Sequence, residues 1–307
     1  MRAPDHSFLR QPLSVSSRPS DLPTRLRGRA FRVADAPEVS RRRSRASDLW
    51  IPVRGARLPI DQQGPVSICH AVALSLPAGA AFSHTTAAVL WGLPLPLGQQ
   101  AERTVHVTTP TGTRARRGRL IIGHQRELAA DQVWQRRGLP LTSPSRTFCD
   151  LSEILDLDDL VAVGDRVAHD HGAAAIEAEL ARRPRNRQSR VLREAVALID
   201  SRAESPKETE LRLLLVRAGF GPFAANFVVR DASGRFIARV DLALPAQRIA
   251  VEYEGDHHRD RDQWRRDLAR RRRLEALGWI YLPVTQADLS DPADLLADLR
   301  AAVARRG

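Results

Sequence analysis

The fold of the C-terminal part is decided by the stretch RVDLALPAQRIAVEYEG, residues 239–255. Two apolar runs flank the turn sequence PAQR, a pattern that predicts two antiparallel strands. With a four-residue turn Leu244 faces Ile249, and counting outward places Asp241 opposite Glu252. Cross-strand partners have Cβ atoms about 4.5–5.5 Å apart on one face of a sheet. The hairpin therefore predicts two neighbouring carboxylates.

This carboxylate pair points to a cation site. Two acids at that separation repel each other and destabilise a sheet unless a cation lies between them. An acid at Asp241, inside the apolar run VDLAL, costs free energy unless it has a task. Mg²⁺ is bound by one or two carboxylates plus water, and it activates water for attack on a phosphodiester. Asp241 and Glu252 are therefore candidate ligands for Mg²⁺ or Mn²⁺.

Two further residues beside the hairpin are candidates for the same site. Glu254 points to the same face as Glu252, and its cross-strand partner by the same count is Arg239. A salt bridge explains that pair equally well, so Glu254 is a second-rank metal ligand. His258 follows in the segment GDHH, where it can act as a general base or bind phosphate. The alternative for His258 is an ordinary surface histidine in a loop.

The segment SPKETELRLLLVRAGF, residues 205–220, predicts a helix that starts at Pro206 and stops at Gly219. Its apolar face consists of Leu211, Leu214, Leu215 and Ala218. Glu208 lies close to that face. Considered alone, Glu208 is a first-turn acid that stabilises the helix by interacting with its dipole. Beside the hairpin acids, it becomes a third catalytic candidate.

A basic helix is predicted at 263–277, followed by a buried strand in WIYLPVT and a final helix in PADLLADLRAAVA. The basic helix has candidate phosphate contacts at Arg266, Arg270, Arg271 and Arg273. A net charge of +12 and a pI near 11.2 favour a polyanionic partner such as DNA. Because Lys207 is the only lysine, this arginine excess also fits a GC-rich genome, and the arginines then form a solvated face.

This order of elements resembles the PD-(D/E)-x-K nuclease superfamily, and within it the branch related to the very-short-patch-repair (Vsr) endonucleases. The matching motifs are SPKETELRLLL, RVDLALP, AVEYEGDHH, DLARRRRLEALGW and IYLPVT, over about 204–300. The resemblance implies a restriction-endonuclease-like domain over 204–303, a mixed sheet flanked by helices. It also implies that Glu208, Asp241, Glu252 and His258 are catalytic. Glu254 stands where the superfamily has a lysine, and the Vsr-like branch dispenses with that lysine too.

The N-terminal region is predicted to contain a basic lead-in and a possible winged helix. Residues 1–30 are polar and lack periodicity, which predicts disorder. Residues 39–49 predict a short helix capped by Ser40, and the Arg-rich strand-like piece IPVRGARL follows. Such a helix with a wing is typical of winged helix-turn-helix modules, in which Arg41, Arg42 and Arg43 would contact DNA. An amphipathic helix with a solvated arginine face is the equal alternative.

Residues 66–202 predict an α+β region. Helices are expected at 66–76 and, after a cap at Ser83, at 84–91; RTVHVTTP and RLIIG predict strands. A helix capped near Ser143 follows, and residues 156–202 are expected to be helical with breaks near Gly172 and Pro184. The motifs SHTTAAVLWGLPLP, VHVTTP and GLPLTSPSRTFCDL resemble the AbiEi family, the antitoxin half of an abortive-infection toxin–antitoxin pair. The resemblance implies an AbiEi-like region over 31–200 and a cognate toxin as a partner.

The cysteines and the apolar segments indicate which classes of protein are not expected. Cys69 and Cys149 lack metal-site spacing and predict buried, reduced thiols in the cytoplasm. No signal peptide or membrane span is expected. Taken together, the sequence predicts a two-domain α/β (α+β) protein and a metal-dependent DNA endonuclease, in DNA repair or in defence against phages and mobile elements. The alternative is a DNA-binding transcriptional regulator or antitoxin-like protein with an inactive nuclease fold.

Overall fold

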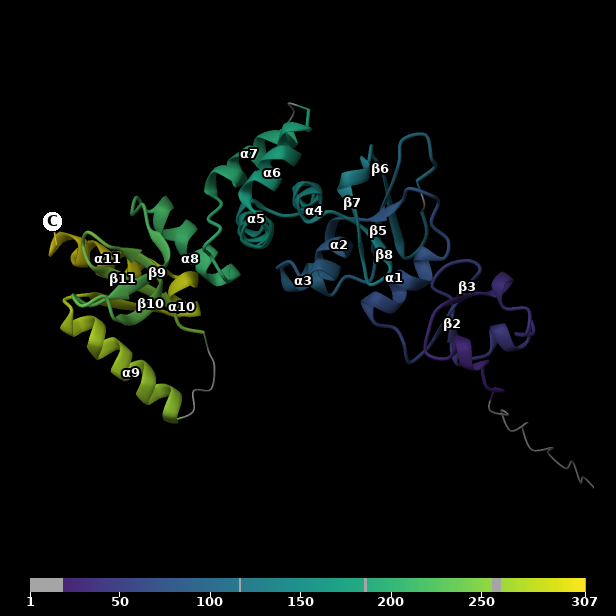
Figure 1. The fold of residues 1–307 in the computed structure, drawn as a ribbon, viewed down its shortest axis with the longest axis horizontal. Coiled ribbons are helices and arrows are strands. Elements are labelled where there is room, and N and C mark those ends of the chain that lie inside the picture. The colour runs from purple at the N-terminus through teal and green to yellow at the C-terminus, as the bar shows by residue number, and fades with distance from the viewer. Residues whose placement is uncertain (1–18, 116, 185–186, 256–260, 307) are drawn as a thin grey trace, which may run out of the picture. The chain divides into compact units, whose positions relative to one another are not determined.

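The computed structural model describes residues 19–115, 117–184, 187–255 and 261–306 (Figure 1). The chain divides into two compact units, Met1–Leu76 and Pro77–Gly307. Sheets of three, four and five strands alternate with helices, which confirms the predicted mixed α/β class. No helix within the described ranges is both long and apolar enough to cross a bilayer.

The first unit is built on a small antiparallel sheet of order β1-β3-β2. Its strands are β1 (Phe31–Arg32), β2 (Leu49–Trp50) and β3 (Ala56–Pro59), and α1 (Pro65–Ala73) packs against β3. Residues 1–18 lie outside the described residues. The expected disorder does not extend over 19–30, because Leu22 and Leu26 are buried with Phe31 in the core of this unit.

The α-helix expected over residues 39–49 is wrong. A 3₁₀-helix, η3 (Arg43–Arg45), forms instead, although Ser40 Oγ does accept a hydrogen bond from Arg43 N at 3.1 Å. The physical reason is tertiary: the Arg43 guanidinium is buried and binds both carboxylate oxygens of Asp48, at 2.8 and 2.7 Å. This contact closes the loop before β2 and overrides helix propensity.

The second unit begins with a mixed five-stranded sheet of order β6-β5-β4-β8-β7. Its strands are β4 (Ala81–Phe82), β5 (Val105–Thr109), β6 (Ile121–Gln125), β7 (Val133–Arg136) and β8 (Leu139–Thr142). Pairs β4–β8 and β5–β6 are parallel, whereas β4–β5 and β7–β8 are antiparallel. The helix α2 (His84–Trp91) follows β4 directly and packs on β5, with the short α3 (Leu97–Gln100) after it.

Four helices continue the second unit: α4 (Pro144–Leu151), α5 (Leu157–His171), α6 (Ala173–Ala181) and α7 (Arg187–Leu198). The breaks at Gly172 and Pro184 are confirmed. Ser143 caps α4 by accepting a hydrogen bond from Arg146 N. Ser83 occupies the N-cap position of α2 but makes no side-chain cap, because its hydroxyl is engaged by neighbouring side chains.

The C-terminal sheet has the order β12-β11-β10-β9. Its strands are β9 (Ala224–Arg230), β10 (Phe236–Leu244), β11 (Ile249–Tyr253) and β12 (Ile280–Val284). The predicted hairpin register is confirmed, since Leu244 pairs with Ile249 and Leu242 with Val251. The strand β9, which pairs along most of β10, was not predicted.

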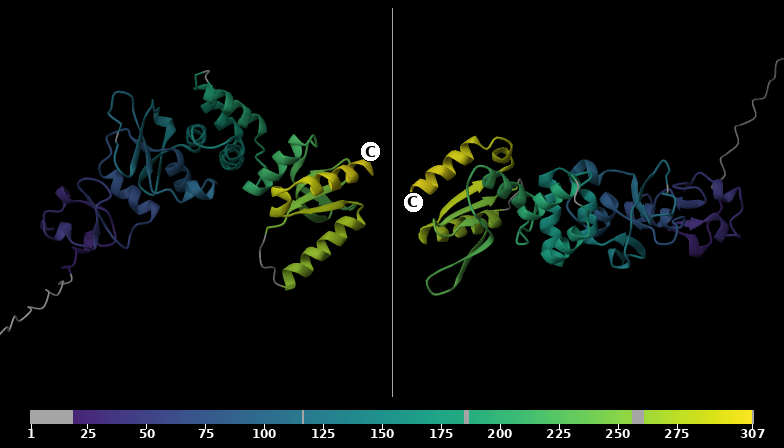
Figure 2. Two further views of the ribbon diagram at one scale, coloured as in Figure 1. Left: turned by 180° about the vertical axis from the view of Figure 1, so that it is seen from behind. Right: turned by 90° about the horizontal axis from the view of Figure 1, so that it is seen from above.

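Helices cover both faces of this sheet (Figure 2). On one face, α8 (Pro206–Arg217), α10 (Gln286–Ser290) and α11 (Ala293–Ala304) share a core with the sheet residues Leu242, Leu244 and Val251. On the other, α9 (Arg261–Ala276) inserts Leu274 against Ala243 and Ala250. Glu252 lies two residues beyond Ala250 on β11 and reaches the same face, where Arg270 of α9 binds it.

The helix α8 also packs against the preceding helices. Leu211 and Leu215 enter the sheet core as predicted, but the unpredicted Leu213 is buried among residues of α4, α5 and α7. Beside it, Arg212 Nη2 donates to Asp165 Oδ2 of α5 at 2.8 Å, and Thr209 Oγ1 donates to the same oxygen at 2.7 Å. The helix therefore needs apolar residues on two sides, which blurs a single-face pattern.

Candidate functional site

The carboxylates of Asp241 and Glu252 form the centre of the candidate site. The ladder between β10 and β11 ends at the pair Leu242–Val251, so the predicted cross-strand pair of Asp241 with Glu252 is not part of it, and these acids are the next residue of each strand. Asp241 Oδ2 accepts a hydrogen bond from the Tyr253 backbone N–H at 2.8 Å. Burial raises the pKa of Asp241 to about 7, and the negative charges of Glu252 and Glu208 act in the same direction.

Glu252 is buried and only half satisfied. Its exposed fraction is 9%, and Oε1 accepts a hydrogen bond from Arg270 Nη1 of α9 at 2.7 Å. Its second oxygen, Oε2, is buried and has no hydrogen-bond partner. A buried carboxylate oxygen without a donor is costly, and a cation is one of the few partners that satisfies it.

Glu208 lies nearby but is held by backbone and amide donors. Its Oε2 accepts hydrogen bonds from Glu204 N at 2.9 Å and from Asn226 Nδ2 at 2.7 Å. The Ser205 hydroxyl caps α8 through Glu208 N at 3.2 Å. Within the described part of the chain, the three acids do not gather their oxygens as closely as a shared ion requires. Glu208 therefore contributes charge at the edge of the Asp241 site.

Glu254 does not form the salt bridge with Arg239 that the strand register predicted. Arg239 pairs with Glu204, through two contacts of 2.7 Å, and not with Glu254. Glu254 Oε1 accepts a hydrogen bond from Tyr281 OH at 3.1 Å. His258 lies outside the described residues.

The predicted DNA-contacting arginines separate into exposed residues and residues that are buried or partly buried. Exposed guanidinium-bearing residues are Arg266, Arg271 and Arg273 on α9, and Arg41 and Arg42 in the first unit. Arg271 also contacts Glu275 at 2.9 Å and stacks over Tyr281. Arg270 is partly buried on Glu252, and Arg43 is buried on Asp48. Arg43 therefore stabilises the loop before β2, and its guanidinium is not presented to a phosphate.

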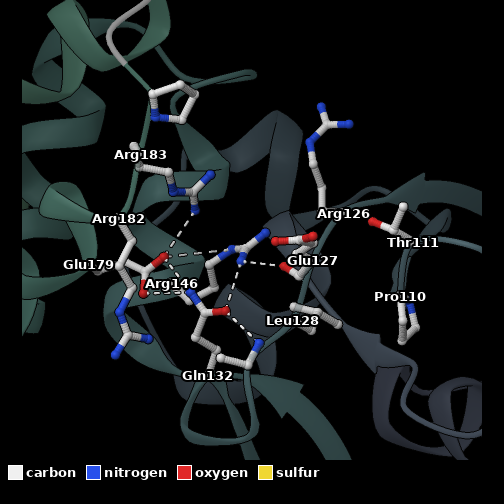
Figure 3. Close-up of a pocket in the computed structure, with 12 residues that line it drawn as sticks. Pro110, Thr111, Arg126, Glu127, Leu128, Gln132, Arg146, Glu179, Arg182 and Arg183 are labelled. Atoms are coloured by element: carbon white, nitrogen blue, oxygen red, sulfur yellow. Dashed lines mark hydrogen bonds and ion pairs between the residues drawn. The ribbon is translucent and has the colours of Figure 1, made fainter.

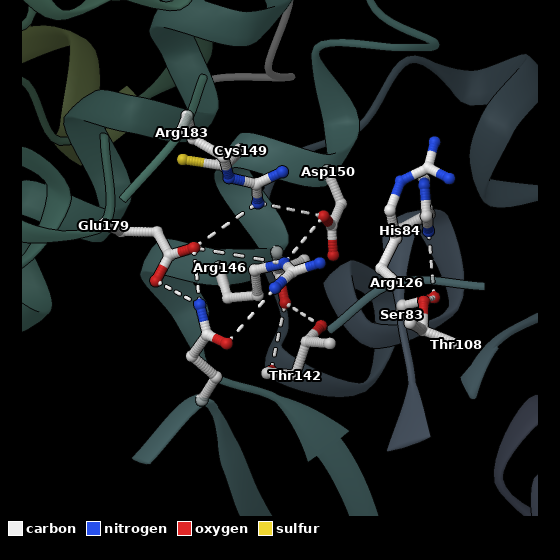
Figure 4. A network of polar contacts seen from close by, with 12 residues as sticks. Ser83, His84, Thr108, Arg126, Thr142, Arg146, Cys149, Asp150, Glu179 and Arg183 are labelled. Atoms are coloured by element: carbon white, nitrogen blue, oxygen red, sulfur yellow. Dashed lines mark hydrogen bonds and ion pairs between the residues drawn. The ribbon is translucent and has the colours of Figure 1, made fainter. Parts of the chain in front are cut away.

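A buried network of arginines and acids was not predicted. Arg146 of α4 donates to Asp150 at 2.9 Å, and Arg183 contacts Asp150 at 3.1 Å and Glu179 at 3.4 Å (Figure 4). Gln132 Nε2 completes it by donating to Glu179 at 2.8 Å. The network lines an open pocket of about 600 Å³ (Figure 3). Because two guanidinium groups face two carboxylates, we interpret it as a structural joint between α4, α6 and the sheet.

Three histidines from separate elements also meet, and this cluster was missed. His84, His106 and His124 each place one ring nitrogen within 4.8 Å of the others. Burial lowers the pKa of His106 and of His124 to about 4, and the neighbouring His84 ring acts in the same direction on both. A sequence signal existed in VHVTT, since a histidine inside an otherwise apolar strand needs a polar partner.

The fold gives the class of the protein, and comparison with known proteins gives its relatives. The described chain is a mixed α/β protein with an acidic pair on its C-terminal sheet. It is 31% identical over 218 residues to "Uncharacterized protein MT2308" and to "Uncharacterized protein Rv2248", each from a strain of Mycobacterium tuberculosis. The match covers 69% of this chain and 77% of each relative, so the chain belongs to the same family as these proteins. No family model and no solved structure matches it.

Proposed function

We propose that the protein is a metal-dependent DNA endonuclease whose active site is centred on Asp241 and Glu252. The observation that carries this proposal is the buried, unpartnered Oε2 of Glu252 beside a second carboxylate whose pKa is raised to about 7. An oxygen without a donor and a raised carboxyl pKa both favour the uptake of a cation. The proposal includes a Vsr-like, restriction-endonuclease-like fold for the C-terminal sheet and its helices.

Asp241 and Glu252 would hold Mg²⁺ or Mn²⁺, because oxygen donors on rigid strands suit a hard divalent cation. When bound, such an ion activates water and stabilises the charge that develops on a phosphodiester. The chain's own contribution is positional: Tyr253 N–H fixes Asp241, and Asn226 together with Glu204 N–H fixes Glu208 beside it. Arginines of α9, including Arg273, would contact DNA phosphates.

Arg270 compensates for the missing superfamily lysine in this proposal. It reaches Glu252 from α9 at 2.7 Å and brings a permanent positive charge to the site. In the first unit, the three-stranded sheet and α1 support a wing-like DNA or partner contact through Arg41 and Arg42. A cognate toxin, as the AbiEi resemblance implies, is the protein partner consistent with this proposal.

The contact between Arg270 and Glu252 also favours a second candidate function. A guanidinium bound to Glu252 neutralises the acid without any ion, as expected for an inactive nuclease fold that serves as a DNA-binding regulator or antitoxin-like protein. The two candidates differ in whether DNA is cleaved or only bound.

Plasmid nicking separates them. Supercoiled plasmid is incubated with the full chain and Mg²⁺ or Mn²⁺, using the wild type, Asp241→Asn and Glu252→Gln. Asp298→Asn on the exposed side of α11 is the matched control, because it removes the same charge from the same part of the chain. We expect nicking to fall by about 100-fold or more in both site variants and to be unchanged in the control. Intact DNA binding without metal-dependent cleavage would contradict the endonuclease and favour the DNA-binding candidate.

A further inference from the structure

The three histidines meet because the five-stranded sheet brings distant segments together. His84 is the first residue of α2, directly after β4, while His106 lies in β5 and His124 in β6. Antiparallel pairing of β4 with β5 and parallel pairing of β5 with β6 place the three side by side. His106 Nδ1 and His124 Nε2 are 3.0 Å apart.

The ring positions approach those of a tetrahedral zinc site. Zn–N bonds of about 2.0–2.1 Å at tetrahedral angles place ligand nitrogens about 3.3 Å apart and ring centres about 5.2 Å apart. The His106 and His124 ring centres are 5.2 Å apart, and those of His84 and His106 are 5.3 Å apart. The His84 and His124 rings are stacked at 3.7 Å, so one must turn outward when an ion enters. Histidine χ2 rotates easily enough for this.

His84 is held in a costly state that an ion would explain. Only 2% of the residue is exposed, and its Nε2 has no hydrogen-bond partner. Its backbone φ of +52° is unfavourable for a residue with a Cβ atom. Ser83 Oγ contacts the other ring nitrogen, Nδ1, at 2.9 Å, and Thr108 Oγ1 donates to Ser83 at 2.8 Å. Metal-binding histidines are commonly oriented through their second nitrogen in this way (Figure 4).

We propose that His84, His106 and His124 bind a Zn²⁺ ion. Three imidazole nitrogens select a borderline transition metal over Mg²⁺. The carboxylate of Glu153 lies 3.9 Å from His84 Nε2, too far for a hydrogen bond, and it accepts one from Arg126 at 3.2 Å, so water is left to complete the coordination of the ion. A histidine pair sharing one proton would explain the 3.0 Å contact of His106 with His124, but it leaves His84 Nε2 with only the Glu153 carboxylate at 3.9 Å. The proposal is independent of the Asp241 site.

Cobalt binding provides the test, because tetrahedral Co²⁺ absorbs visible light strongly. The full, untagged chain is stripped with a chelator and titrated with Co²⁺, which is then displaced by Zn²⁺. We expect a visible band in the wild type and at least a roughly tenfold loss of affinity in His124→Gln, whose side chain lies on the edge strand β6. His169→Gln on exposed α5 surface is the control and should match the wild type.

A second variant guards against misfolding. Ser83→Ala keeps all three imidazoles and removes the group that orients His84, so it should weaken Co²⁺ binding by about 10–100-fold. Circular dichroism checks that each variant folds. If His124→Gln does not fold, Co²⁺ binding by Ser83→Ala provides the test. The proposal is overturned if the wild type gives no tetrahedral band, or if the folded variants bind Co²⁺ as the wild type does.

Discussion

The guanidinium of Arg270 donates a hydrogen bond of 2.7 Å to Glu252 Oε1 and thereby connects α9 to β11. In the proposed nuclease, this positive charge and a divalent cation act on the same carboxylate. Arg270 and the cation therefore both neutralise Glu252, and the loss of one should increase the stabilising effect of the other. Thermal unfolding with and without Mg²⁺ can measure this.

Arg270→Met should destabilise the metal-free protein by about 2 kcal/mol, because a charged hydrogen bond is lost and Glu252 remains buried. Mg²⁺ should then raise the melting temperature more in the variant than in the wild type, since the ion replaces the missing charge. Differential scanning fluorimetry with and without Mg²⁺ measures both effects. An equal or smaller Mg²⁺ response in Arg270→Met would contradict the shared site.

The raised pKa of Asp241 predicts a stability that depends on pH. Its pKa is about 7 in the folded chain and about 3.9 in an unfolded one, so the folded state binds more protons between these values. The contribution to stability is complete below about pH 4 and is lost as pH rises through about 7. Urea denaturation at several pH values should show this decline in the metal-free wild type. Asp241→Asn should flatten the decline, and parallel curves for the two proteins would refute the assignment.

The buried Asp165–Arg212 pair is predicted to hold α8 against α5. Asp165 is 2% exposed, and its carboxylate accepts hydrogen bonds from Thr209, Arg212 and the Asp200 backbone N–H. Asp165→Ala should cost about 3–5 kcal/mol in urea denaturation, because a buried guanidinium loses its counter-ion.

The exposed Asp158–Arg217 pair joins the same two helices and supplies the control. Asp158→Ala should cost at most about 1 kcal/mol. Similar losses for the two variants would show that the interface does not depend on the buried pair.

Arginines on α9 are predicted to contribute to DNA affinity through phosphates. Arg273 is exposed, and Arg273→Gln should weaken binding to all sequences alike. The slope of log affinity against log salt should decrease by about one. Fluorescence anisotropy over a salt series measures this slope, with Arg300→Gln on α11 as the control. An unchanged slope would remove Arg273 from the proposed interface.

Local chemistry was sufficient to predict the C-terminal hairpin. A four-residue turn fixed the register of Leu244 with Ile249, and the ladder continues to Leu242 and Val251, the residues next to Asp241 and Glu252. The strand β9 was harder to find, because Asn226 interrupts it with a left-handed φ of +47° and its apolar pattern is weak.

Features made by distant contacts could not be predicted. The histidine cluster depends on which strands become neighbours. The absence of an α-helix over 39–49 depends on the pairing of Arg43 with Asp48. The contact of Arg270 with Glu252 likewise required knowing which face of the sheet α9 covers. In each case the sequence contains both residues, but it does not indicate that the fold brings them into contact.

The most direct test of the central claim is anomalous scattering from crystals of the wild-type protein soaked in Mn²⁺. The proposed active site predicts an anomalous peak bonded to carboxylate oxygens of both Asp241 and Glu252. It also predicts that this peak is absent in Asp241→Asn crystals soaked in the same way. If the wild-type crystals show no peak between the two acids and Arg270 keeps its contact with Glu252, the metal-dependent nuclease is contradicted.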